Sequence, residues 1–253
     1  DIKSGVVVTY YDKNQNFGAI GTFISFAELN TILHKVNPSS EFGDIMYVQN
    51  KFNLNELYKD FPLFKERLGS DGKERRLVSS IFDTLPEVFF DEKQSEEQIQ
   101  IYGRQNNERV FKWIDRKYIE KHKNLDKYKV FVPAANGSGA IGEVLSTPLI
   151  GEPLIGHTQT FISLGEFDTK NDATSLYKYI KTKFARVMLG IKKTTQNNKT
   201  PETWSKVPMQ DFTANSDIDW SKSISEIDQQ LYKKYGLDDK EIAFIEEKVR
   251  AMD

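Results

Sequence analysis

The stretch that decides the fold is residues 129–167, KVFVPAANGSGAIGEVLSTPLIGEPLIGHTQTFISLGEF. Each end is a β-branched run, Val130 to Val132 and Thr160 to Ser163, and such runs predict strands. The middle is dense in Gly, Pro, Ser and Thr, which predicts a loop. Long ordered loops held between rigid elements commonly carry binding residues. We therefore expect this loop to contact a ligand.

The composition is that of an ordinary folded protein. The chain has 253 residues, of which 38% are hydrophobic and 12% aromatic, enough to form a buried core. It has no cysteine, which excludes disulfides, thiolate metal sites and cysteine nucleophiles. No apolar run reaches the roughly 20 residues that a membrane helix needs, and no signal-peptide pattern opens the chain. We expect a cytoplasmic protein without a membrane partner and, because the first residue is Asp, a fragment of a longer one.

Charge is segregated along the chain although the net charge is only -2. Residues 101–135 carry 9 basic and 4 acidic side chains, and residues 174–206 carry 8 and 1. The two basic blocks flank the central stretch, so their meeting in space would give the positive surface expected of a nucleic-acid-binding protein. The alternative is that these lysines simply keep helix faces solvated.

The pattern of elements predicts an α+β fold with hairpins and packed helices but no regular strand–helix alternation. A helix over residues 173–193, capped by Asn171 or Asp172, is the clearest element. The other expected elements are a hairpin at 5–11 and 18–26, helices at 27–36 and within 53–68, a second hairpin at 99–102 and 110–114, a short strand within 204–212, and C-terminal helices at 224–235 and 238–252.

Residues 137–142 match the dinucleotide-binding fingerprint Gly-x-Gly-x-x-Gly letter for letter. The fingerprint binds a pyrophosphate only where a helix begins directly after it. The continuation EVLSTPLIGEPLIG contains two prolines and two glycines, so no such helix can form. We instead expect a small-residue loop whose backbone amides approach a phosphate or a base edge, with a purely structural loop as the alternative.

Catalytic and metal-binding patterns are weak. His34, His122 and His157 are scattered, so we expect no metal site. The clusters at residues 91–93 and 166–170 each combine two acids with a lysine, as a metal-dependent nuclease would, but such short matches are common by chance. The chain has no Gly-x-Ser-x-Gly elbow and no phosphate-binding Gly-Lys-Ser/Thr loop, so we expect no catalytic residue.

Polar residues at the tip of the second hairpin suit base recognition. Arginine pairs with guanine, and asparagine or glutamine with adenine, although a solvated turn explains the same residues. The candidate base-reading residues are Arg104, Gln105, Asn106, Asn107, Arg109, Asn136 and Ser138.

A second set of residues is expected to grip DNA phosphates, mainly from the basic side of the 173–193 helix. The candidate phosphate-binding residues are Lys112, Lys117, Gly137, Gly139, Lys181, Lys183, Arg186, Lys192 and Lys193.

Several strings resemble one protein family. They are DIKSGVVVTYYDK, YGRQNNERVFKWIDRKYI, KYKVFVPAANGSGAIGE, YIKTKFARVMLGIKKTTQ, VPMQDF and IDQQLYKKYGLDDKEIAFIEEKV. The chain resembles the C-terminal part of adenine-specific DNA methyltransferases of restriction-modification systems, including type II enzymes that fuse nuclease and methylase. In that family a TaqI-like target-recognition domain follows the catalytic domain. The resemblance spans nearly the whole chain and is most specific over residues 99–250.

The resemblance implies a specificity module with double-stranded DNA and an upstream methyltransferase domain of the same chain as partners. The family's catalytic tetrapeptide, Asn/Asp-Pro-Pro-Tyr/Phe, is absent; residues 37–40, Asn-Pro-Ser-Ser, do not replace it. We therefore expect no methyl transfer and no cofactor in this fragment, with S-adenosylmethionine bound upstream in the parent enzyme.

The implied division is residues 1–25 as a remnant hairpin of the methylase domain, 26–210 as the target-recognition domain and 211–253 as a C-terminal helical segment. Two alternatives remain open. One is a metal-dependent DNA endonuclease domain of a restriction enzyme. The other is a protein-interaction module whose basic helix docks on an acidic partner.

Overall fold

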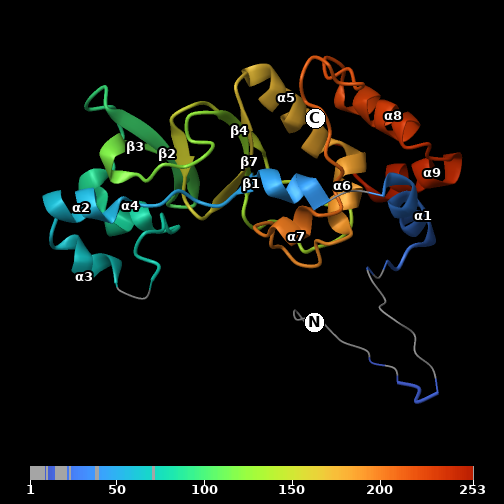
Figure 1. Ribbon diagram of the computed structural model, residues 1–253, viewed down its shortest axis with the longest axis horizontal. Helices are drawn as coiled ribbons and strands as arrows, with labels where there is room; N and C mark the ends of the chain where they lie inside the picture. Colours follow the sequence, from blue (N-terminus) through green and yellow to red (C-terminus); the bar gives the residue numbers. More distant parts are fainter. Residues whose placement is uncertain are drawn as a thin grey trace.

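The computed structural model describes residues 9, 11–14, 22, 24–37, 40–69 and 72–252, and it has the expected α+β fold. The hairpin expected near the start, and with it most of the remnant methylase unit over residues 1–25, lies outside the described residues. Figure 1 shows two lobes, with β1, β4 and β7 at the centre. In the described part of the chain, no helix combines the length and the apolar character needed to cross a membrane.

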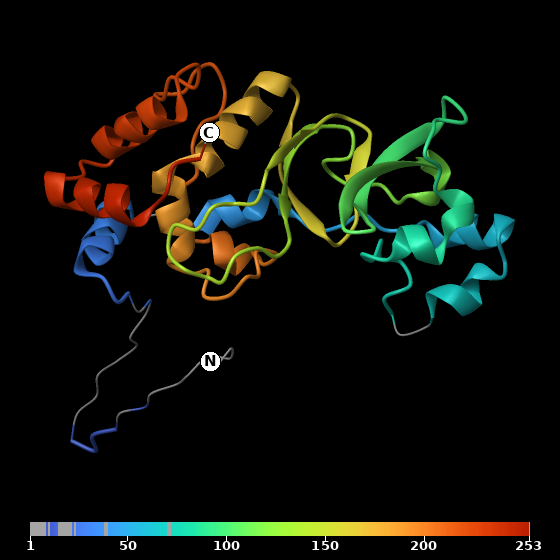
Figure 2. The same cartoon turned by 180° about the vertical axis from the view of Figure 1, so that it is seen from behind.

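The larger lobe is built on an antiparallel sheet in the order β1-β7-β4-β5. Helix α1 packs beside α9 although some 200 residues separate them in sequence, and Lys35 reaches Glu241 at 2.6 Å (Figure 2). The elements of this lobe are α1 (Ala27–Val36), η1 (Ser40–Ile45), β1 (Met46–Tyr47), β4 (Tyr128–Pro133), β5 (Leu149–Gly151), β7 (Phe161–Phe167), α5 (Lys170–Lys181), α6 (Lys183–Gly190), α7 (Pro201–Trp204), α8 (Ile224–Lys234) and α9 (Asp239–Lys248).

The smaller lobe carries a sheet in the order β3-β2-β6, with β2 and β3 antiparallel and β6 parallel to β2. Its own core is formed by apolar side chains such as Phe52, Leu57, Ile101 and Ile114, each fully buried. The elements are α2 (Leu54–Asp60), α3 (Phe64–Leu68), α4 (Ile81–Thr84), η2 (Pro86–Val88), β2 (Gln98–Gln105), β3 (Glu108–Asp115), η3 (Arg116–Tyr118) and β6 (Ile155–His157).

The hairpin predicted around residues 99–114 is confirmed, and its strands are longer than expected. They continue through the polar cluster to a two-residue turn at Asn106 and Asn107, whose φ angles are 51° and 65°. Asparagine tolerates this left-handed conformation better than most residues, which explains its presence at both turn positions.

The central stretch contains more strand than predicted. Both end strands form, and β4 includes Pro133, which was expected to lie outside it. Within the predicted loop, β5 pairs with β4 and β6 crosses to the smaller lobe to pair with β2. Residues 134–148 form the longest irregular segment of the stretch, and no helix follows the Gly-x-Gly-x-x-Gly pattern. The prediction that no helix begins directly after this pattern is therefore confirmed.

The prediction of one helix over residues 173–193 was wrong, because the chain forms α5 and α6 with a break at Thr182. Thr182 has φ -58° and ψ 149°, which is not helical, and its side chain accepts a hydrogen bond from the Ala185 amide at 3.1 Å. This caps a new helix. The cap of α5 is Thr169, so the expected caps Asn171 and Asp172 lie inside the helix.

The remaining C-terminal predictions are confirmed for two helices and wrong for one strand. The helices expected over 224–235 and 238–252 form as α8 and α9, each with a capping box, at Ser223 with Glu226 and at Asp238 with Glu241. The strand expected within 204–212 is absent, and α7 ends at the first residue of that segment, Trp204. Proline at the first position of α7 favours helix initiation there.

The two lobes meet at a buried polar and aromatic junction around His157. The amide of His157 donates to Asn50 Oδ1 at 2.8 Å, and the amide of Asn50 donates to the His157 carbonyl at 3.1 Å. Tyr102 from β2 stacks on Phe161 from β7, with ring centroids 4.1 Å apart. Burial lowers the pKa of His157 to about 3, so the imidazole is neutral at physiological pH.

We predict that His157 makes the fold acid-sensitive. A histidine pKa that is lower in the folded state means that the unfolded chain binds more protons, so stability is full above pH 6.5 and falls as pH decreases towards 3. The loss attributable to His157 is about 2 kcal/mol at pH 5. Urea unfolding at pH 7.5 and pH 5 should show a smaller pH dependence for His157→Gln than for wild type. His34→Gln, at an exposed position, should retain the wild-type dependence, and equal dependence in all three proteins would contradict the prediction.

Candidate nucleic-acid interface

The hairpin tip presents two free amides on a braced turn. Arg104 donates to the Asn107 carbonyl at 2.8 Å, and Gln105 donates to Asp83 at 2.6 Å, so both side chains brace the turn. Asn106 and Asn107 are exposed, and their side chains make no hydrogen bond within the described chain. Their amides are therefore available to an external partner, in a conformation that the turn fixes.

Arg109 joins this hairpin tip to the irregular loop at residues 134–148. Its guanidinium donates to the Thr147 carbonyl at 2.6 Å and to the Ser146 carbonyl at 3.0 Å, and it lies over the Phe161 ring at 5.6 Å. The two regions predicted to read bases, which come from different lobes, are thus brought together. Arg109 itself is held by these contacts and acts mainly as the connection.

Asn136 does not point an unused amide at solvent. Its Nδ2 donates to the Val144 carbonyl at 2.8 Å, and its Oδ1 accepts from Asn198 at 2.5 Å. Its backbone carbonyl also accepts from Lys193 at 2.8 Å. These bonds fold the loop back on itself, so in this conformation Asn136 supports the loop and its side-chain amide is not free to read a base as predicted.

The glycine-rich turn does form a cradle for an anion, but the anion is Glu143 of the same loop. Its carboxylate accepts from the Ser138 amide and hydroxyl, both at 2.6 Å, from the Gly139 amide at 2.9 Å and from Lys193 at 2.9 Å. Burial opposes ionisation, yet the ammonium and these donors lower the pKa of Glu143 to about 2. The phosphate roles predicted for Gly137 and Gly139 and the base role of Ser138 are therefore not available in this conformation.

The loop lies close against the larger lobe beside α6 and α7 (Figure 2). Gly139 has φ 95°, and a Cβ there would lie 2.5 Å from the Thr194 carbonyl carbon. Glycine is required at this position because both the conformation and the close approach exclude a side chain.

The basic helix is turned inward, contrary to the prediction of a surface grip on phosphates. Lys181, Arg186 and Lys193 are 5%, 1% and 3% exposed, respectively. Arg186 donates to the carbonyls of Gly142 and Arg250 and to those of the α5–α6 junction. Burial lowers the pKa of Arg186 to about 10, so it remains charged. Arg186 and Lys193 are thus held inside the protein by their own hydrogen bonds, and Lys181 lines an internal cavity instead of an outer surface.

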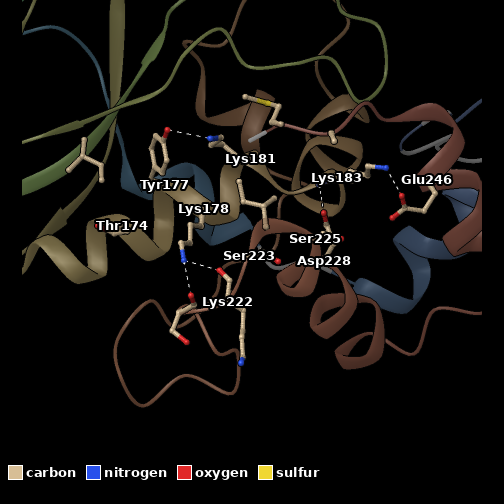
Figure 3. Close-up of a pocket in the computed structure, with 15 residues that line it drawn as sticks. Thr174, Tyr177, Lys178, Lys181, Lys183, Lys222, Ser223, Ser225, Asp228 and Glu246 are labelled. Carbon is tan, nitrogen blue, oxygen red and sulfur yellow. Dashed lines mark hydrogen bonds and ion pairs between the residues drawn. The ribbon is translucent and has the colours of Figure 1, made fainter.

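Lys183 faces a cavity of about 670 Å³ between α5, α8 and the C-terminal end of α9 (Figure 3). It forms an ion pair with Glu246, which also lines the cavity. On the opposite wall Lys178 donates to three backbone carbonyls, those of Trp220, Ser221 and Lys222. The close-up shows both ammonium groups engaged with protein atoms, which explains why the basic periodicity of this helix does not give an open basic surface.

Of the other predicted phosphate contacts, Lys117 and Lys192 remain partly open to solvent, with side chains 49% and 27% exposed, whereas the Lys112 side chain is 12% exposed. Lys112, Lys117 and Lys192 form ion pairs with Asp91, Asp60 and Glu202. Surface ion pairs contribute about 0–1 kcal/mol each, so a phosphate can replace the carboxylate at little cost.

Sequence reasoning assigned no binding role to a third polar loop, residues 194–200, TTQNNKT. The amide of Asn136 donates to the Gln196 carbonyl at 2.8 Å, and Ala135 pairs with Asn197, so this loop lies beside the start of the 134–148 loop. Thr195, Gln196 and Lys199 are exposed. The available signal was the Gln-Asn-Asn triplet, which occurs both here and at the hairpin tip.

The two carboxylate clusters considered for nuclease chemistry do not assemble. Asp91 pairs with Lys112, Asp168 pairs with Lys127, and Glu166 accepts from Tyr47. Among the described residues no three histidine or acidic side chains are grouped as a metal ion requires.

Comparisons with protein-family models, curated proteins and solved structures give no match.

We predict that Glu143→Gln destabilises the loop at residues 134–148. The amide keeps the shape of the side chain but leaves the Lys193 ammonium, 3% exposed, without its counter-charge, which costs about 3 kcal/mol. Urea unfolding should show this loss, and limited proteolysis should cut within residues 134–148 sooner. Glu92→Gln, at an exposed site without an ion pair in the described chain, should change neither measurement.

Proposed function

We propose that this protein is a double-stranded DNA recognition module of the kind found in restriction-modification adenine methyltransferases. The observation that carries the proposal is a series of contacts that joins three polar loops: the hairpin tip at 104–109, the 134–148 loop and the 194–200 loop. Arg109 connects the first to the second, and the pairing of Ala135 with Asn197 connects the second to the third.

The chemistry of these loops suits base edges. A two-stranded ribbon fits the major groove, where asparagine and glutamine pair with adenine. Asn106 and Asn107 occupy the tip of such a ribbon, and Gln196 and Lys199 are exposed on the 194–200 loop. Rigid support of these groups lowers the entropy lost on binding.

Under this proposal the chain selects the site, and chemistry takes place elsewhere. Methyl transfer, flipping of the target adenine and S-adenosylmethionine would belong to an upstream domain of the same cytoplasmic enzyme. The interior position of Lys181, Arg186 and Lys193 argues against the alternative in which a basic helix docks on an acidic protein.

We predict salt-dependent binding to duplex DNA and a sequence preference that depends on the hairpin tip. Replacing Asn106 and Asn107 together by glycine removes both amides but preserves the left-handed turn. Selection from a randomised duplex pool should enrich a motif with wild type, and the double variant should lose preference by roughly 5-fold to 100-fold at the affected positions. Its affinity for unrelated duplexes should be unchanged.

Fluorescence anisotropy at several salt concentrations supplies the decisive measurement. Wild-type protein that shows no salt-dependent affinity for any duplex contradicts the proposal. Plasmid cleavage in the presence of magnesium, abolished by Asp168→Ala, would instead support the endonuclease alternative.

A further inference from the structure

Three short segments of the smaller lobe form a ribbon with one apolar and one basic face. Lys51 is paired with Arg76 in antiparallel fashion, and Phe52 is paired with Ile119 in the same way. Phe52 and Ile119 are 0% and 2% exposed, so their side chains face the core. Side chains alternate along an extended segment, which places Lys51 and Arg76 on the outer face. Both are exposed.

This outer face holds two like charges directly opposite one another. Directly opposite residues of an antiparallel pair have Cβ atoms roughly 5 Å apart, and like charges at such positions repel. Neither Lys51 nor Arg76 forms an ion pair or side-chain hydrogen bond within the described residues. The adjacent carboxylate, Glu120, is occupied by Arg75. The fold therefore keeps an unfavourable pair without an internal counter-charge.

An anion between the two side chains would remove the repulsion. Arginine presents a planar fork that matches two phosphate oxygens, and lysine adds a compact charge. Lys121 lies one residue beyond Glu120, whose amide donates to the Lys51 carbonyl, and it is also exposed. A row of such cations fits a repeating phosphodiester backbone.

The pair lies within reach of the proposed base-reading loops. The segment from Arg76 to Asp83 leads to the hairpin tip, where Asp83 accepts from Gln105. Seven residues span at most about 25 Å, and one turn of duplex DNA rises about 34 Å. One duplex can therefore contact the tip with its bases and Lys51 and Arg76 with a phosphate less than one turn away.

We propose that Lys51 and Arg76 form a DNA phosphate-binding site on the smaller lobe, which takes the place of the buried basic helix. The site rests on the proposed function, because its ligand is the backbone of the same duplex that the loops read.

The test compares two double variants. One carries both Lys51→Glu and Arg76→Glu, and the control carries both Lys222→Glu and Lys240→Glu. The control makes the same change in net charge at exposed positions of the larger lobe. Anisotropy titrations with one duplex should show at least tenfold weaker binding for the first variant. The slope of log affinity against log salt should also fall by about 2, because each phosphate contact contributes about 0.9. The control should keep the wild-type slope.

A single variant separates lost contacts from misfolding. Arg76→Glu places opposite charges across the ribbon, so its melting temperature should equal or exceed that of wild type while its DNA affinity falls. If wild type binds duplex and the Lys51 and Arg76 variants behave like the control, the phosphate site is wrong and the recognition module stands. If wild type binds no duplex, both proposals fail.

Discussion

Two buried cations, Arg186 and Lys193, determine where the 134–148 loop lies. Removing a guanidinium or an ammonium from water is costly unless every donor finds an acceptor, so the chain must bring oxygen atoms to Arg186 and Lys193. Arg186 collects carbonyls from the α5–α6 junction, from Gly142 and from Arg250, and Lys193 collects the Asn136 carbonyl and the Glu143 carboxylate. Loop, helix break and C-terminal segment are thereby fixed to one another.

This arrangement explains how an irregular stretch between β4 and β5 acts as a rigid support. Its glycines allow tight turns around Glu143 and close contact with Thr194, and Arg109 attaches its far end to the hairpin. The polar groups left for a partner lie on the neighbouring hairpin tip and the 194–200 loop. Under the proposed function, the binding groups would therefore lie on the hairpin tip and the 194–200 loop, which the 134–148 loop holds in position.

Local signals in the sequence predict much of the fold. The hydrophobic period and the capping boxes predict the helices at residues 27–36, 224–235 and 238–252, and the asparagines at a tight turn predict the second hairpin. Together these elements give the α+β class. Local signals do not predict the break at Thr182, because the helical period continues through it and the cap becomes favourable only in the packed structure. The sequence does not predict the burial of Arg186 either. Cations are rarely buried, and the carbonyls that make this one acceptable come from Gly142 and Arg250, each more than 40 residues away.

The route of the chain has a consequence for how such a protein can diversify. Residues from Asn50 to Leu125 form most of the smaller lobe as an insertion into the larger one, and both ends return to the β6 region, Asn50 by its bonds with His157 and Leu125 by accepting from the Leu154 amide. An insertion whose ends are adjacent can be exchanged as a unit without changing the path of the chain in the larger lobe. The exchange has one geometric condition: the incoming lobe must offer a strand edge that accepts β6 in parallel register. Recombination that respects this condition would transfer the β2–β3 hairpin intact.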